Sequence, residues 1–460
     1  MASPTIARHA AAYVAAVVLL CLPALWNGFP LMFDDVGGYL ERWPSGSLGI
    51  GRSAVYGLLL WITQSASFFP VIVLQALVTT FVVDRAIKVF VGPDCSRWLL
   101  PVVIAAIAAA TGAAMFVSKA IPDAWAAPGV LALHLLAWHT ESLTKFERGA
   151  MAAIVAFAGA SHMATFGVLA GLSVLYAIAW LARRRLGVAP QGTGYAIAAV
   201  WSGLLLLMAG NAVVTGRAAL MPGGEIFLLG RMMEDGMAAE ILSEECPRPD
   251  WQLCLYRDAL PSYQEAFIFD TDSPLRSIGG EHDPRARDEI ASIIARSLAR
   301  HPLAHAGRAI ALTATQFVNV GTGGAMEPMI SWHTRWALTR YAPALIPPFD
   351  AAHQQTDTID MGSWSDWVVG PASIAASFAL PVLAVLLWRS GRRREAMLPA
   401  FLFLALLGNA AICGVMTRSI DRYQARLVWL AELAVGLTGQ AFARRVDVSD
   451  GGCAVALSPS

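Results

Sequence analysis

Two adjacent carboxylates follow the first apolar segment of the chain. The run Phe33-Asp34-Asp35-Val36-Gly37-Gly38-Tyr39 comes directly after residues 11–29, which carry no charge and are long enough to cross a lipid bilayer. Like charges held side by side at a membrane surface cost free energy unless a substrate or partner uses them. A carboxylate in this position is suited to take a proton from a hydroxyl group. A solvated loop with two helix-capping carboxylates is the other interpretation, and the rest of the chain decides between them.

More charged side chains are expected on the same membrane face, at the ends of other apolar segments. Arg418, Arg422 and Arg426 recur every four residues and form one stripe if their helix begins that early. Such a stripe either anchors lipid headgroups or binds a phosphate group. The shorter loops add further candidates: Arg52 in the first, Lys119 and Asp123 in the second, and His162 in the third.

Each of these residues also has an ordinary structural interpretation. Lys119 can extend its ammonium group from a helix end into water, and Asp123 follows a proline and can cap a helix. His162 can be a hydrogen-bonded polar residue at a helix end. Carboxylates and arginines gathered on one outer face nevertheless fit one chemistry well. In sugar transfer from a lipid phosphate, Arg or Lys binds the departing phosphate while a carboxylate deprotonates the acceptor hydroxyl that attacks the anomeric carbon.

The composition places the chain among multi-pass membrane proteins. Of its 460 residues, 56% are hydrophobic and 14% are charged, whereas a soluble protein carries about a quarter charged residues. The formal net charge of +0 argues against nucleic acid as a partner. Gly-rich stretches are present, but none matches a nucleotide-binding motif, and sugar transfer from a lipid phosphate needs none.

The loops between the apolar segments predict the orientation. Basic clusters follow every second predicted span and fall on the side of Arg8, which places both termini in the cytoplasm. The preference for Arg over Lys and the abundance of Ala are associated with GC-rich bacterial genomes, so we expect a bacterial inner membrane. Residues 11–29 lack a signal-peptidase site and are read as a retained first span. About ten spans are predicted, at residues 11–29, 69–90, 98–117, 124–139, 150–160, 164–182, 194–214, 368–388, 397–416 and 427–442.

Four regions follow from this topology. They are an N-terminal membrane module (1–214), an extracytoplasmic and mainly helical insertion (215–367), C-terminal membrane helices (368–442) and a cytoplasmic tail (443–460). In the insertion, residues 225–242 predict one helix, and Asp283 with Pro284 predicts the start of another. Residues 53–64 and 305–320 predict interfacial or re-entrant helices. Cys246 and Cys254 are expected to form a disulfide on this outer side.

This pattern resembles the GT-C superfamily of integral-membrane glycosyltransferases, which includes protein O-mannosyltransferases and bacterial lipid A aminoarabinose transferases. The resemblance covers about the first 210 residues. It rests on Asp34-Asp35 in the first outer loop, on the surface helix near Arg52-Ser53-Ala54-Val55-Tyr56, and on Pro122-Asp123 as a second acidic position. Many members carry a soluble domain at the C-terminus, whereas here the insertion interrupts the bundle. The resemblance implies an all-α, GT-C-like bundle and a sugar donor linked to polyprenyl phosphate.

The expected function is therefore a membrane glycosyltransferase of the cell envelope, acting on an extracytoplasmic lipid, glycan or protein hydroxyl and surrounded by membrane lipids. Asp34 or Asp35 would be the general base, and Lys119 with the arginine stripe would bind the donor phosphate. Arg52, Tyr56, Asp123 and His162 would orient the substrates. Some members use a divalent cation beside the acidic pair, but two adjacent carboxylates alone are a poor cation site. No metal ligand is assigned, and that cation stays open. A transporter or lipid flippase, or a non-catalytic membrane scaffold, are the alternatives.

Overall fold

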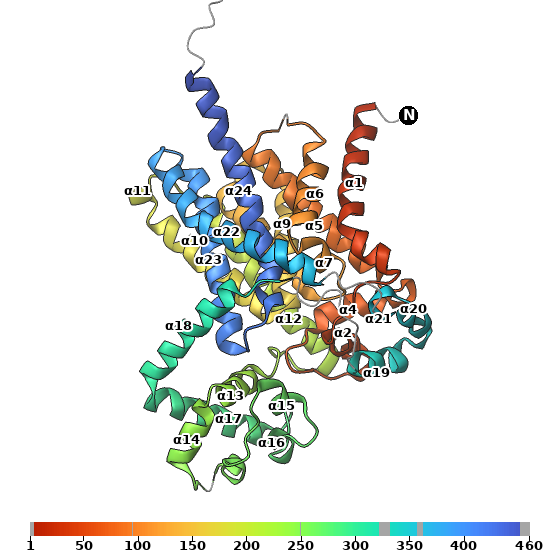
Figure 1. Cartoon of the computed structure of the whole chain (residues 1–460), viewed down its shortest axis with the longest axis vertical. Coiled ribbons are helices and arrows are strands. Elements are labelled where there is room, and N and C mark those ends of the chain that lie inside the picture. Colours follow the sequence, from red (N-terminus) through yellow and green to blue (C-terminus); the bar gives the residue numbers. More distant parts are fainter. Residues whose placement is uncertain (1–3, 94, 249, 322–331, 357–361, 451–460) are drawn as a thin grey trace, which may run out of the picture.

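The computed structural model describes residues 4–93, 95–248, 250–321, 332–356 and 362–450, and within these ranges the chain is helical and contains no β-strand (Figure 1). Six helices contain a stretch long and apolar enough to cross a membrane. They are α1 (Pro4–Asn27), α5 (Phe69–Phe90), α10 (Met163–Leu181), α12 (Thr193–Thr215), α22 (Gly362–Arg389) and α23 (Arg393–Met416). The chain is thus a helical protein with the features of a multi-pass membrane protein.

The other four predicted spans also coincide with helices, but these are shorter or more polar. They are α6 (Leu99–Ala110) with α7 (Ala113–Val117), α8 (Ala126–Trp138), α9 (Lys145–Ser161) and α24 (Asp421–Asp450). The structure therefore supports six spans by length and composition, and the predicted count of ten stays a prediction. Helix α24 also continues past residue 442, so the expected tail begins as helix, and residues 451–460 lie outside the described part of the chain.

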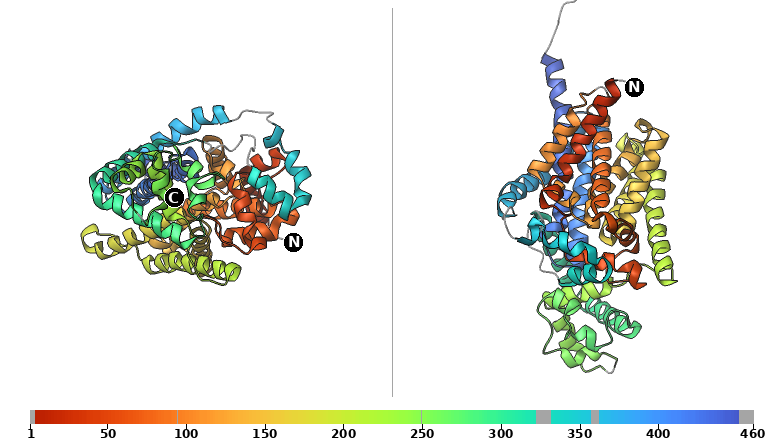
Figure 2. Two further views of the ribbon diagram at one scale, coloured as in Figure 1. Left: turned by 90° about the horizontal axis from the view of Figure 1, so that it is seen from below. Right: turned by 90° about the vertical axis from the view of Figure 1, so that its right-hand side faces the viewer.

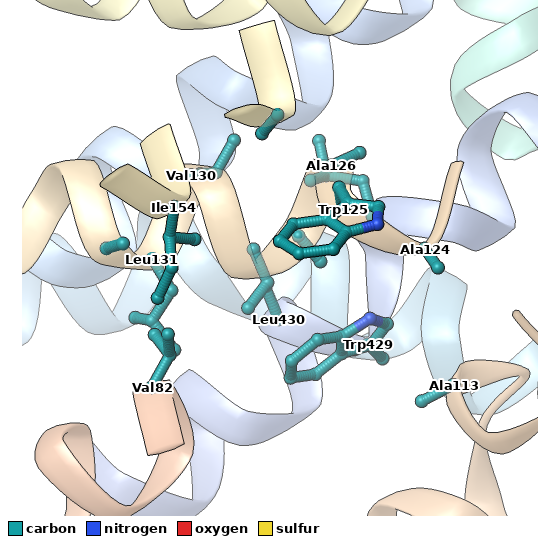
Figure 3. Close-up of a cluster of buried hydrophobic side chains, with 14 of the residues drawn as sticks. Val82, Ala113, Ala124, Trp125, Ala126, Val130, Leu131, Ile154, Trp429 and Leu430 are labelled. Carbon is teal, nitrogen blue, oxygen red and sulfur yellow. The ribbon is translucent and has the colours of Figure 1, made fainter. Parts of the chain in front are cut away.

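Helix α8 lies at the centre of the bundle. All 13 of its residues are buried, and it packs against α5, α9, α10, α12, α23 and α24. A helix that is apolar on every side is stable only when other helices surround it. Figure 3 shows this core, where Trp125 and Trp429 lie near Val130 and Leu131 of α8, together with Ile154 of α9. The core fixes the start of α24, which contributes to the site described below, and the start of α8, which directly follows the short helix η2 (Pro122–Trp125) and its site residue Asp123.

Glycines let the helices of the bundle approach closely. A Cβ atom at Gly203 of α12 would lie 2.6 Å from the carbonyl oxygen of Ala156 on α9, and one at Gly129 of α8 would lie 2.8 Å from Ala158. Neither position has room for a side chain. Small residues at helix crossings are the usual means by which membrane helices pack.

The described helices of the insertion pack in two structural parts. Its first part has a separate apolar core built from α13 (Gly224–Glu234), α14 (Met237–Glu245), α15 (Gln264–Phe269), α16 (Pro274–Ser277) and α17 (Pro284–Arg300). Its second part comprises α19 (Trp332–Tyr341), α20 (Ile346–Asp350) and α21 (His353–Thr356), which pack near the end of α1 and on the segment that follows it. Helix α18 (Pro302–Val318) follows α17 and packs along α23 (Figures 1 and 2).

Local signals explain where these helices begin and end. Asp283 caps α17 by accepting a hydrogen bond from the amide of Arg285, as its position before Pro284 predicts. The single helix predicted over residues 225–242 is wrong, because the chain breaks into α13 and α14 at Gly236, whose φ of 83° belongs to the left-handed region. The interfacial candidates 53–64 and 305–320 are the helices α4 (Ala54–Thr63) and α18.

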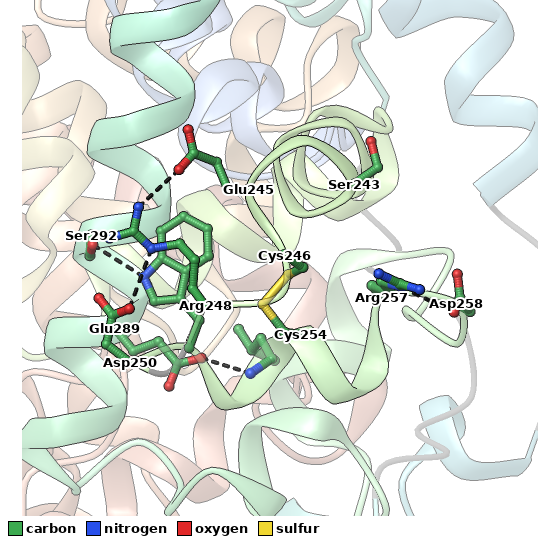
Figure 4. The surroundings of a disulfide bond; sticks show 12 residues. Ser243, Glu245, Cys246, Arg248, Asp250, Cys254, Arg257, Asp258, Glu289 and Ser292 are labelled. Atoms are coloured by element: carbon green, nitrogen blue, oxygen red, sulfur yellow. Dashed lines mark hydrogen bonds and ion pairs between the residues drawn. A yellow bond between two sulfur atoms is a disulfide. The ribbon is translucent and has the colours of Figure 1, made fainter.

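Cys246 and Cys254 form a disulfide that ties the end of α14 to the short helix η4 (Gln252–Tyr256). Figure 4 shows Arg248, which belongs to the loop closed by the disulfide, bridging Glu245 and Asp250. The carboxylate of Glu289 on α17 accepts a hydrogen bond from the amide of Leu253 over 2.8 Å. The disulfide loop is therefore packed on α17 as part of the first half of the insertion.

The bundle has two different ends. The N-terminus, the basic turn α11 (Arg183–Leu186) and the C-terminal end of α24 lie at one end (Figure 1). The segment after α1 with α2 (Asp35–Leu40) and α4, together with both parts of the insertion, lies at the other. This separation is the one that the alternation of basic loops predicts. We call the end with the insertion the insertion end.

Candidate functional site

The two adjacent carboxylates point in different directions. Asp35 is the first residue of α2 and its side chain is 18% exposed, whereas Asp34, just before the helix, is exposed. The backbone of Asp34 is fixed by Thr334 of α19, whose hydroxyl donates to the Asp34 carbonyl oxygen over 2.8 Å. The structure therefore places Asp35, and not Asp34, in the interior of the insertion end.

Asp35 lies between two arginines. Its Oδ1 accepts a hydrogen bond from Arg52 over 2.5 Å, and its Oδ2 accepts one from Arg422 over 3.0 Å. Burial alone would raise the pKa of the Asp35 carboxyl, but the guanidinium groups of Arg52 and Arg422 outweigh this and hold the pKa below its usual range. Asp35 is thus a charged carboxylate at neutral pH, with one lone pair on each oxygen still open to a further donor.

Arg52 reaches Asp35 from the turn before α4. Ser53 caps α4 by accepting from the amide of Val55, which fixes the chain direction just after Arg52. A Cβ atom at Gly38 would lie 3.2 Å from the Arg52 side chain, so this glycine leaves room for the arginine. Tyr56 is fully buried and donates to Gln75 over 3.1 Å. It therefore packs inside the bundle beside the site and is not exposed to a substrate.

Two cations share the ring of Phe33. The guanidinium of Arg422 lies 4.0 Å from the ring centroid, and the ammonium of Lys119 lies 5.3 Å from it. Lys119 is completely buried and also lies over the ring of Phe116. Aromatic faces stabilise buried cations through the ring quadrupole. The segment that follows α1 and carries Asp34 and Asp35, here called the acid loop, is joined directly to the loop that carries Lys119. Leu31 and Lys119 form an isolated parallel bridge between them.

A second charged group lies deeper and is built around Arg426, one helical turn further along α24. Its Nη1 donates to Asp123 over 2.8 Å and to the Nδ1 of His162 over 3.0 Å. Its Nη2 donates to the Oδ1 of Asn409 on α23 over 2.8 Å. Asp123 belongs to the short helix η2 (Pro122–Trp125), and His162 joins α9 to α10. Residues from four separate loops and helices therefore meet at one guanidinium.

The protonation states of this second group follow from the contacts. Burial raises the pKa of Asp123, but Arg426 and His162 more than compensate, and the net pKa lies well below the usual range. Burial, and then the charge of Arg426, lowers the pKa of His162 to about 4. His162 is therefore neutral at pH 7, with Nδ1 as the acceptor for Arg426 and the proton on Nε2.

Arg418 does not belong to either group. Helix α24 begins at Asp421, so Arg418 lies in the preceding loop and the expected stripe contains Arg422 and Arg426 only. Arg418 is 45% exposed and its Nε contacts Glu265 of α15 at 2.8 Å. It connects the first part of the insertion to the bundle, and the prediction of a three-residue stripe is wrong because the helix starts later than the spacing requires.

The inward-facing charged residues form a cationic cluster at the insertion end. Four cations, Arg52, Lys119, Arg422 and Arg426, surround the two carboxylates Asp35 and Asp123, which gives this group a net charge of +2. Several of its buried donors have no hydrogen-bond partner among the described residues: Nε and Nη1 of Arg422 and Nε of Arg426. Buried donors normally have partners, so these atoms mark a place where an anionic group would be stabilised.

The structure also identifies site residues that the sequence analysis missed. Thr334 and Gln354 come from α19 and α21 and bond to the acid loop; the amide of Gln354 bonds to both the N–H and the carbonyl oxygen of Met32. Asn409 and Phe33 contact the arginines directly. No local pattern distinguishes such residues from other polar or aromatic residues of the chain.

The acidic pair does not form a metal site among the described residues. The candidate group of carboxylates and histidine is Glu240, Glu244 and His301, on the surface of the insertion at α14 and the end of α17. The two glutamates are exposed, and His301 already contacts Glu244 at 3.2 Å. At Asp35, arginines occupy the positions that a cation would need.

The chain matches no protein-family model, no curated protein and no solved structure. The function must therefore be argued from the site itself.

Proposed function

We propose that the protein is a membrane glycosyltransferase that moves a sugar from a polyprenyl-phosphate donor to an extracytoplasmic hydroxyl acceptor. The observation that carries this proposal is the cationic cluster, in which buried guanidinium donors without partners lie beside a charged carboxylate at the end of an apolar bundle. A phosphate with a long apolar chain fits both features. The phosphate would accept from the arginines, and the chain would remain among apolar helices and lipid.

The arginines would hold the departing phosphate. The open Nε and Nη1 atoms of Arg422 would donate to phosphate oxygens, and the Lys119 ammonium near the same Phe33 ring would add charge. Guanidinium groups suit this task because their fixed donors match phosphate geometry. Charge that develops on the leaving oxygen is best stabilised by donors that are already in place.

Asp35 would be the base. The acceptor oxygen forms a bond to the anomeric carbon, the carbon–oxygen bond to the phosphate breaks, and the bonding electrons leave with the polyprenyl phosphate. The acceptor proton passes to Asp35. A sugar carbon attacked in this way resembles an oxocarbenium ion, and the hydroxyl becomes strongly acidic as the bond forms, so a carboxylate of low pKa is sufficient. Asp123 and His162 would act indirectly, by holding Arg426.

The neighbouring carboxylates provide a matched test. Purified protein in lipid nanodiscs is assayed for sugar transfer from polyprenyl-phosphate sugars, with Asp35→Asn compared with Asp34→Asn. We expect Asp35→Asn to lower turnover by roughly 10²–10⁴-fold, the usual contribution of general base catalysis. Asp34→Asn should retain most activity because Asp34 is exposed. Full activity of Asp35→Asn, with normal expression and folding, would refute the assignment of the base.

A transporter is the second candidate, and one residue favours it. Glu432 lies eleven residues into α24 and its Oε1 accepts from Ser373 of α22 over 2.7 Å. Ionisable residues inside a membrane bundle often mark ion or substrate pathways. Uptake or flipping of a lipid phosphate by proteoliposomes, abolished by Glu432→Gln but retained by Asp35→Asn, would favour transport over sugar transfer.

A further inference from the structure

The loop before α24 is held by one buried amide from the insertion. Gln316, near the end of α18, is fully buried. Its Oε1 accepts from the Ile420 amide over 3.0 Å, and its Nε2 donates to the Ile420 carbonyl over 2.9 Å. Both polar groups of Ile420 are therefore satisfied by a residue 104 positions away.

This contact lies next to the cationic cluster. Ile420 directly precedes Asp421, the first residue of α24, and Arg422 lies in the first turn of that helix. The loop 417–420 has no regular structure, and its backbone bonds to α24 where the Ile420 carbonyl also accepts from the amide of Tyr423 over 3.1 Å. Asn319 adds one further bond, from its side-chain nitrogen to the hydroxyl of Ser419 over 3.0 Å.

Helix α18, which carries Gln316, is held in place by two neighbouring helices. It lies against α23 so closely that a Cβ atom at Gly414 would be 2.7 Å from the carbonyl oxygen of Leu312. Phe317, the residue after Gln316, packs against Phe378 of α22 and Phe403 of α23. The position of Gln316 is thus set by two membrane helices, and Gln316 in turn sets the position of the loop.

We propose that Gln316 is a positioning residue, which directs Arg422 toward Asp35 and the donor phosphate through the backbone of Ile420. The inference rests on the proposed function for the role of the phosphate, but the positioning of Arg422 can be measured without it. The insertion then contributes to the site directly, because a residue of α18 fixes the orientation of an arginine in the first turn of α24.

The test compares three variants of the full-length protein in nanodiscs. Gln316→Met keeps the side-chain length and removes both hydrogen bonds. Gln316→Glu keeps the acceptor for the Ile420 amide and loses the donor, and it serves if the Met variant does not fold. Thr313→Val is the matched control, since Thr313 lies on the same helix and its hydroxyl, within the described part of the chain, bonds to Ala309 of that helix and not to the loop before α24.

The first readout is the rate at which phenylglyoxal modifies Arg422, measured by mass spectrometry, with Arg426 as the internal reference. We expect Gln316→Met to raise modification of Arg422 several-fold and to leave Arg426 and the Thr313→Val control unchanged. Equal increases at Arg422 and Arg426 would mean general loosening of α24, and unchanged modification would mean no positioning. Either result would overturn the inference.

The second readout is binding of a fluorescent polyprenyl monophosphate. Gln316→Met should weaken binding by about tenfold in the parent background and have no further effect when Arg422 is already Ala, since coupled residues are not additive. Equal losses in both backgrounds would show that Gln316 acts independently of Arg422 and would overturn the inference. If the parent does not bind this probe, the proposed donor is wrong, and the modification rates alone decide the positioning.

Discussion

Arg422 and Asp35 are 387 positions apart in the sequence, and the Nη2 of Arg422 donates to the Oδ2 of Asp35 over 3.0 Å. The contact joins the loop after the first helix of the chain to the first turn of the last one. A site made in this way exists only when the bundle is complete. Residues 332–356 pack on the acid loop, where the hydroxyl of Thr334 accepts from the amide of Gly37. This packing helps to hold Asp35 in position for the distant arginine.

Arg422→Ala is expected to weaken binding of a polyprenyl phosphate. Hydrogen bonds to charged groups contribute about 1.5–3 kcal/mol, so the dissociation constant should rise by roughly ten- to a hundredfold. Arg418→Ala is the matched control, because Arg418 is exposed and pairs with Glu265 outside the cluster. Fluorescence titration of both variants in nanodiscs measures the difference. Equal losses for the two arginines would contradict the location of the phosphate.

The buried pair of Asp123 and Arg426 predicts a non-additive effect on stability. Arg426→Met leaves the Asp123 carboxylate buried without its main partner, which should cost about 3–5 kcal/mol. Adding Asp123→Asn removes that charge and should restore much of the stability. Thermal unfolding of the purified proteins in detergent measures both changes. A double variant less stable than Arg426→Met alone would mean that Asp123 stabilises the fold by contacts other than this pair.

His162 predicts a dependence of stability on pH. The pKa of His162 is about 4 in the folded protein and 6.5 in the unfolded chain. Between these pH values the unfolded chain binds a proton that the folded chain does not. Stability should therefore fall as the pH decreases from about 6.5 to 4, by about 3 kcal/mol at most, and should lose nothing more from this group below that range. Asp35 and Asp123 also have lowered pKa values. Their effect on stability appears only when the pH falls into the range in which carboxyl groups of the unfolded chain bind protons.

Unfolding midpoints between pH 7 and pH 4.5 separate the contribution of His162 from the rest. The slope should be shallower in His162→Gln and unchanged in His282→Gln, whose side chain is 65% exposed. Identical slopes in the parent and in His162→Gln would show that burial and the charge of Arg426 do not hold His162 neutral.

The sequence predicts the helices of the bundle and most of the charged residues of the site, because both depend on local patterns. Apolar runs mark the helices, and charged residues at their ends on one face can meet when the helices pack. Which of two adjacent carboxylates turns inward is not a local property. Asp35 is selected over Asp34 by Arg52, 17 positions away in the same loop, and by Arg422 and Thr334, which come from distant parts of the chain.

Two features depend on contacts between distant segments. The arginine stripe assumes that α24 begins before Arg418, but the loop is held by Gln316 and the helix begins at Asp421. Within the insertion, residues 332–356 pack on the acid loop, whereas α13–α17 build a separate apolar core. In both cases a tertiary contact decides the local structure, and no periodic pattern in the sequence records such contacts.

The disulfide gives a prediction that is independent of the site. Reduction, or Cys246→Ser with Cys254→Ser, should destabilise the first part of the insertion by about 2–3 kcal/mol, the chain-entropy value for a short loop. Sugar transfer should change little, since the site contacts the second part of the insertion and α18. Peptide mass spectrometry without reduction tests the bond itself, and finding both thiols free would contradict it.

The last prediction concerns orientation, on which the compartment of the site depends. Asp272, between α15 and α16, and Arg184 of α11 are both exposed. Helices α15 and α16 lie at the insertion end, and α11 lies toward the opposite end (Figure 1). Each is replaced by Cys in a background with Cys95→Ser and Cys453→Ser; Cys21 and Cys413 are buried. Because basic loops stay in the cytoplasm, a membrane-impermeant maleimide should label Asp272→Cys in intact cells and should label Arg184→Cys only after the membrane is opened. The reverse pattern would place Asp35 and the arginines on the cytoplasmic side, where an extracytoplasmic acceptor cannot reach them.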